Sequence, residues 1–103
     1  MNASEETTKQ TFAIILPRLA GARGRGAEIA SALPGNLSDA TVTVDCSELM
    51  SAAQGFTDEL CKQMLEVRQA SSVVFTKAPD RFRNFVLLSA KNRDFASRVS
   101  FQE

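Results

Sequence analysis

Apolar residues in this chain form short runs that alternate with longer segments of helical periodicity. The run 12–16, FAIIL, is continuous and stops at Pro17, which predicts a buried strand that ends there or lies at a sheet edge. In 40–47, ATVTVDCS, valine alternates with threonine, which predicts a strand with Val42 and Val44 on one face. The apolar segment 71–78, SSVVFTKA, predicts a third strand.

Helical spacing appears between these runs. The segment 27–33, AEIASAL, predicts a short helix that PGN at 34–36 stops. A second helix is expected from Phe56 to Val67, with acids in its first turn, and a third from about Asp80 to the low nineties. The tail 95–103, FASRVSFQE, is either a short last strand or a helical extension.

The alternation of strands and helices predicts an α/β layered domain. We expect a central, mostly parallel sheet of four strands flanked by about three helices. Residues 1–10, MNASEETTKQ, are polar and predict a flexible N-terminal arm, so that 11–103 form the single domain.

Composition removes several functional classes. Lys plus Arg and Asp plus Glu number 12 each, so no net charge favours nucleic acid or a membrane surface. Histidine is absent, which removes the commonest general base and metal ligand, and we expect no metal, cofactor or catalytic residue. Cys46 and Cys61 are expected to be reduced core thiols. With no signal peptide or long apolar run, we expect a cytoplasmic protein that does not enter the membrane.

GARGRG, residues 21–26, predicts a glycine-rich loop between a strand and a helix. Such a loop can hold a phosphate at a helix N-terminus, with Arg23 and Arg25 adding charge, so a nucleotide- or phosphate-binding module is the alternative function. The spacing matches neither common phosphate-binding motif. The other interpretations are a basic loop that faces a partner and a solvated turn.

The stretch 45–64, DCSELMSAAQGFTDELCKQM, concentrates acids and hydroxyls. Asp45, Asp58 and Glu59 could serve acid–base chemistry or hold a divalent metal, or they could brace a turn and open a helix. The hydroxyls of Ser47, Ser51 and Thr57 are candidates for phosphorylation, but a structural role is the favoured interpretation. A separate basic group near the C-terminus does not favour nucleic-acid binding, because acids dilute it; its members are Lys77, Arg81, Arg83, Lys91, Arg93 and Arg98.

VTVDCSELMSAAQGFTDEL, together with the upstream ARGRGAEIASAL, resembles the STAS-like family, a bacterial domain family of unknown function related to anti-sigma-factor antagonists. That family has a strand ending in DFSGV, a short turn, and F-A-D-E-L opening a helix, with R-x-x-G upstream. The resemblance covers about residues 20–66. The positions that match the central motif are Asp45, Ser47, Phe56, Asp58, Glu59 and Leu60.

The resemblance implies a small, non-enzymatic regulatory domain that docks a partner protein, such as a GHKL-type ATPase kinase. In the related regulators that kinase phosphorylates a serine in the turn, but the corresponding residue here is Gln54. The phosphorylation switch is therefore expected to be lost, or moved to Ser51 or Thr57. An unpaired edge strand also allows a homodimer.

We therefore expect a docking surface formed by the turn and helix at 51–63 and by the glycine-rich loop. Phe56 is expected inside, and Glu59, Lys62 and Gln63 are expected to face outward. The full set of expected partner-binding residues is Ser51, Gln54, Thr57, Glu59, Lys62, Gln63, Arg23 and Arg25.

Overall fold

A computed structural model describes residues 10–103, and the expectation of a flexible arm at 1–9 lies outside that range. Gln10, counted above with the arm, is the first residue of β1. The strands are β1 (Gln10–Ile15), β2 (Leu19–Ala20), β3 (Ala40–Asp45), β4 (Ser51–Ala52), β5 (Ser72–Thr76) and β6 (Val99–Gln102). The helices are α2 (Arg23–Ala30), α3 (Gln54–Cys61), α4 (Asp80–Asn92) and the short 3₁₀ turn η2 (Ala96–Arg98). A π-helical segment, η1 (Lys62–Val67), continues α3.

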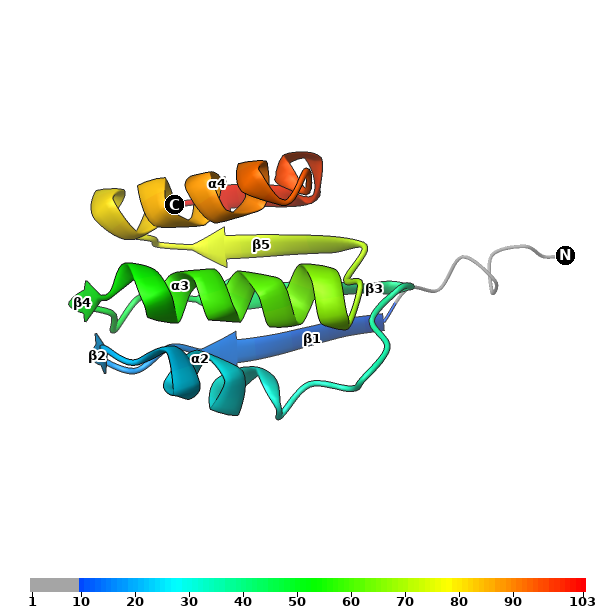
Figure 1. Cartoon of the computed structure of the whole chain (residues 1–103), viewed down its shortest axis with the longest axis horizontal. Coiled ribbons are helices and arrows are strands. Elements are labelled where there is room, and N and C mark those ends of the chain that lie inside the picture. The colour runs from blue at the N-terminus through cyan, green and yellow to red at the C-terminus, as the bar shows by residue number, and fades with distance from the viewer. Residues whose placement is uncertain (1–9) are drawn as a thin grey trace, which may run out of the picture.

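The main sheet has the order β1-β3-β5-β6, and all of its pairings are parallel. The three α-helices lie over one face of this sheet (Figure 1). This confirms the predicted α/β layered domain. The tail forms a strand rather than a helical extension, and β1, which ends before Pro17, lies at an edge as expected.

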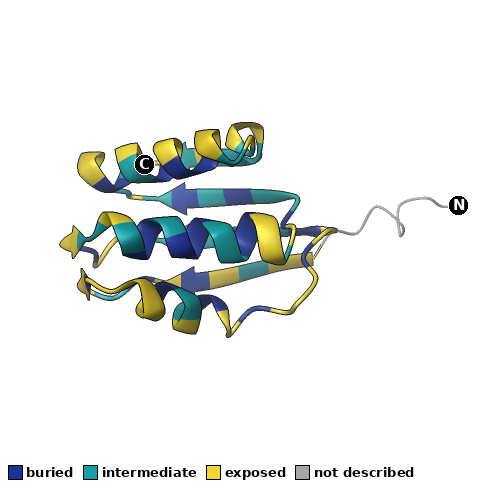
Figure 2. Ribbon diagram, in the orientation of Figure 1, coloured by how far each residue is buried: buried dark blue, intermediate teal, exposed yellow. Residues whose placement is uncertain are grey.

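The core lies between the sheet and the helices. Val42 and Val44 of β3 point into it, as the alternation at 40–47 predicts, together with Val73 and Phe75 of β5 and Ile14 of β1. The buried stretches of the strands lie beneath the helices (Figure 2). The expectation that the run 12–16 is buried throughout was wrong, because Ala13 and Ile15 of β1 are exposed. The opposite face of the sheet carries the threonines of β3 at intermediate exposure. The helices therefore bury the valines of β3 and leave its threonines on the outer face, where Ile15 of β1 is also exposed.

The glycine-rich segment is not a loop. Helix α2 begins at Arg23, so Gly24, Arg25 and Gly26 are helical, and none of the described glycines has a positive φ. The prediction of a loop over residues 21–26 was wrong because it placed the start of the helix at Ala27. What Gly26 provides is close packing, as described below.

Residues 17–22 and 46–53 add a small element that the sequence did not predict. Strands β2 and β4 pair in parallel beyond the carboxyl edge of the main sheet, with Leu19 beside Ser51 and Ala20 beside Ala52. The N–H of Ala53 also donates to the carbonyl of Ala20 (2.8 Å). This miniature sheet fixes the point at which α3 begins.

Candidate functional site

Asp45 closes β3 and braces the turn that follows. Its Oδ1 accepts a hydrogen bond from the backbone N–H of Ser47 (2.8 Å). That bond lowers the pKa of the Asp45 carboxyl, so the carboxyl is ionised and committed to the turn. The expected bracing role of Asp45 is confirmed, and the chain then runs through Met50 into β4.

Helix α3 begins at Gln54, two residues before the expected start. The residue before it, Ala53, has no side chain that could accept from the first N–H groups. Phe56 and Leu60 are fully buried, as expected for the anchors of this helix. Asp58 and Glu59 lie one turn further in, so the expectation that they occupy the first turn and complement the helix dipole was wrong.

Gly26 and Arg23 join α2 to α3. A Cβ on Gly26 would lie 2.7 Å from the carbonyl oxygen of Phe56, so only glycine allows this approach. Three residues earlier, Nη1 of Arg23 donates to Asp58 Oδ2 (3.1 Å) and to Glu59 Oε1 (3.3 Å). The segments that carry the family resemblance, R-x-x-G and F-x-D-E-L, therefore contact each other directly in the fold.

Asp58 links these helices to α4. Ser89 Oγ donates to its Oδ1 (2.8 Å), and Nη2 of Arg93 donates to its Oδ2 (2.9 Å). Burial raises the pKa of this carboxyl, but the hydrogen bonds from Ser89, Arg23 and Arg93 outweigh that effect and lower the pKa overall. A carboxylate held by two arginines and a hydroxyl is poorly placed to accept a proton from a substrate.

Glu59 is buried, with only 8% of the residue exposed, so the expectation that it faces outward was wrong. Nε2 of Gln63 donates to Glu59 Oε2 (2.7 Å), and this bond is the main reason why the pKa of Glu59 is lowered. Gln63 accepts in turn from Arg68 (2.7 Å). Glu59 and Gln63 thus belong to a network that stabilises the helices.

Most of the other expected partner-binding residues lie on the surface, and one lies in the core. Ser51 is exposed on β4 and Gln54 is exposed at the first turn of α3. Arg23 and Arg25 are exposed on α2, where Arg25 pairs with Glu28 (2.7 Å). Lys62 and Gln63 have intermediate exposure.

Thr57 is completely buried, and its hydroxyl donates to the carbonyl of Ala53 (3.0 Å). The expectation that Thr57 contacts a partner or accepts a phosphate is therefore inconsistent with the folded domain, because its hydroxyl is turned into the core. Ser51 is the candidate hydroxyl that remains accessible.

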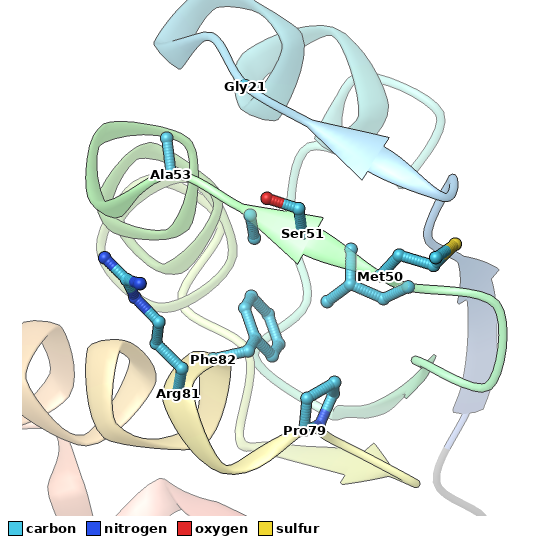
Figure 3. Close-up of a pocket in the computed structure, with 9 residues that line it drawn as sticks. Gly21, Met50, Ser51, Ala53, Pro79, Arg81 and Phe82 are labelled. Carbon is cyan, nitrogen blue, oxygen red and sulfur yellow. The ribbon is translucent and has the colours of Figure 1, made fainter.

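Two hollows flank the first turn of α3. The first hollow, of about 360 Å³, lies between β4, α3 and α4 (Figure 3) and is lined by Gly21, Leu49, Met50, Ser51, Ala52, Ala53, Pro79, Arg81 and Phe82. The second hollow, of about 380 Å³, lies between α2, α3 and α4 and is lined by Arg23, Gln54, Gly55, Asp58, Phe85, Leu88, Ser89 and Asn92. Residues 51–55, which were expected to form part of the docking surface, therefore lie between the two hollows.

Large apolar side chains are exposed near residues 51–55. Leu19 of β2 is 71% exposed, Met50, which directly precedes β4, is 67% exposed, and Leu88 on α4 is also exposed. Sequence reasoning missed Leu19 and Met50, because the pairing of β2 with β4 depends on a long-range backbone contact. It also treated Arg81 only as part of a diffuse basic group.

That basic group is spread over several elements rather than gathered in one patch. Arg83 pairs with Glu103 (3.4 Å), and Arg93 pairs with both Glu66 (3.0 Å) and Asp58. Arg98 donates to the carbonyl oxygens of Leu65 and Ala70. Arg81 has no ion-pair partner within residues 10–103.

Both cysteines are buried and free, as expected. Burial raises the pKa of the Cys46 and Cys61 thiols to about 12, so both are protonated at neutral pH. Within the described range, no group of three or more acidic or cysteine side chains is arranged to hold a metal ion.

Comparison with known proteins gave no match to a family model, to a curated protein or to a solved structure. Among the helices of residues 10–103, none has the length and apolar character needed to cross a membrane.

Proposed function

We propose that this domain is a non-enzymatic, cytoplasmic regulatory module that docks a partner protein on the surface around the first turn of α3. The observation that carries the proposal is the combination of two hollows with exposed Leu19, Met50 and Leu88 around one turn. Exposed apolar side chains grouped beside a depression are typical of protein-interaction sites.

The state of the reactive groups supports a binding role over catalysis. The thiols are buried and protonated, Asp45 is engaged by the turn, and Asp58 and Glu59 are engaged by arginine and glutamine. The resemblance to STAS-like domains points to the same surface, and Gln54, which replaces the phosphorylated serine, is exposed on it. A GHKL-type ATPase kinase is the partner class that this resemblance suggests.

Co-purification from the cells that produce the protein tests the proposal. Met50→Asp and Gln54→Arg place charges on the proposed surface, and both residues are exposed, so the fold should be retained. Lys91→Glu, an exposed position near the end of α4, serves as the control. We expect wild type and the control to retain the same partner and the two surface variants to lose it. Equal recovery with all four proteins would contradict the proposal.

A further inference from the structure

The first hollow has both polar and apolar walls, with the positive charge of Arg81 at its rim. Phe82, which is 3% exposed, packs into the core at this hollow, and Leu49 and Pro79 add apolar surface. None of the described residues that line it is acidic. Glu48 and Asp80 stand next to lining residues in the sequence but do not line the hollow themselves.

Arg81 supplies the charge. Its side chain extends from the first turn of α4 toward the first turn of α3 (Figure 3). The guanidinium carbon lies 5.6 Å from the centre of the Phe85 ring, within the distance for a cation–π contact. Phe85 lines the second hollow and Arg81 lines the first, so the guanidinium stands at the boundary between the two.

The carboxylates near the second hollow do not cancel this charge. Asp58 is paired with Arg23 and Arg93, and Glu59 with Arg23. Arg81 is therefore the cation that lines the first hollow, and it has no carboxylate partner within residues 10–103. Arg18 has no carboxylate partner in that range either, but it lines neither hollow, and its Nη2 donates to Sδ of Met50 (3.1 Å). A complementary surface must bring negative charge to this point and apolar surface beside it.

From this arrangement we propose that the partner docks through an acidic segment that carries a bulky apolar side chain. The apolar side chain enters the first hollow between Met50 and Phe82, and a neighbouring Asp or Glu carboxylate pairs with Arg81. The volume of about 360 Å³ is near the lower end of the range for small-molecule pockets, about 300–1,000 Å³, which suits a single large side chain. The inference rests on the proposed docking function and specifies its chemistry.

A displayed library of random peptides tests this chemistry without knowledge of the natural partner. We would select binders on wild type, Arg81→Glu and Lys91→Glu, and check each variant by circular dichroism. Wild type and Lys91→Glu should enrich acidic peptides with a large apolar residue, and Arg81→Glu should not. A synthetic peptide from the wild-type selection should bind Arg81→Glu at least about tenfold more weakly, and its affinity should fall as salt increases.

The outcomes separate the two levels of the proposal. Enriched peptides that lose binding to Met50→Asp but show no acidic bias would overturn the acidic segment and leave the docking function standing. Selection of the same peptides by the Arg81→Glu variant would also overturn the acidic segment and leave the docking function standing. The docking surface itself would be overturned if no peptide were enriched above a blank surface, or if the selected peptides bound Met50→Asp as tightly as wild type.

Thermal melts with ATP and GTP form a separate experiment. A rise in melting temperature that Arg81→Glu abolishes would assign the hollow to a nucleotide instead.

Discussion

Replacing Gly26 by alanine is expected to destabilise the domain by about 1–3 kcal/mol, although alanine is normally the better helix former. The added Cβ would lie 2.7 Å from the carbonyl oxygen of Phe56 and 3.1 Å from the backbone nitrogen of Leu60. Both neighbours are backbone atoms of α3, so α2 must move away and loosen the contact between the helices. A fall in melting temperature of roughly 4–20 °C is expected for a domain of this size.

Gly24 provides the matched control. It belongs to the same helix, but a Cβ there would meet nothing within 4 Å. Gly24→Ala should therefore stabilise the domain by about 0.5–1 kcal/mol through helix propensity alone. Thermal or urea unfolding of both variants measures the difference, and stabilisation by both substitutions would contradict the close packing of α2 on α3.

Replacing Asp58 by alanine is expected to cost about 2–3 kcal/mol. The change removes the acceptor shared by Arg23, Arg93 and Ser89, and leaves the half-buried Arg93 with only Glu66. Glu66→Ala is the control, because it removes the other carboxylate on Arg93 from a more exposed position. Its cost should be within about 0.5 kcal/mol, and equal losses for the two variants would argue against Asp58 as the centre of the network.

The same carboxyl gives the domain a predictable acid response. Because the pKa of Asp58 is lower in the folded state, its stabilising effect is complete above the unfolded value of about 3.9 and is lost as pH falls through the folded pKa. The stability difference between wild type and Asp58→Asn should therefore shrink below about pH 4. Urea unfolding at a series of pH values measures it, and a difference that stays constant to low pH would contradict this assignment.

Strands β1, β3 and β5 of the main sheet could be predicted because each shows a local apolar pattern in the sequence, whereas the pattern of the tail left β6 open. The alternation of valine and threonine in 40–45 predicted which face of β3 is buried. The continuous run at 12–16 predicted the strand β1, but it did not predict that one face of this edge strand is exposed. Helix α4 was placed correctly from Asp80, where Pro79 precedes it. These predictions needed only local patterns in the sequence and no knowledge of long-range contacts.

The start of α2 was missed because its residues look like a loop. Arg23, Gly24, Arg25 and Gly26 have low combined helix propensity, yet all four are helical, because Gly26 packs on α3 and Arg23 pairs with Asp58 and Glu59. Here tertiary contacts override local preference. No periodic pattern in the sequence predicts that these four residues are helical, although R-x-x-G was part of the family resemblance.

Burial on α3 was misjudged for a related reason. A charged residue such as Glu59 is usually placed on a solvent face, but Arg23 reaches across from α2 and allows it to be buried. Thr57 is buried because its hydroxyl is satisfied within the helix by the carbonyl of Ala53. The docking surface that we propose therefore lies at the first turn of α3 and at the miniature sheet, instead of on the outer face of α3.

Photo-cross-linking tests that location most directly. A photoreactive phenylalanine analogue would replace Met50, exposed just before β4, or Gln54, exposed at the first turn of α3. In separate controls it would replace Ser38 or Lys91, both exposed elsewhere. In the cells that produce the protein, we expect the same discrete adduct from positions 50 and 54, its loss with Arg81→Glu, and none from the controls. Adducts of equal yield from all four positions, or only from positions 38 and 91, would contradict docking at the first turn of α3.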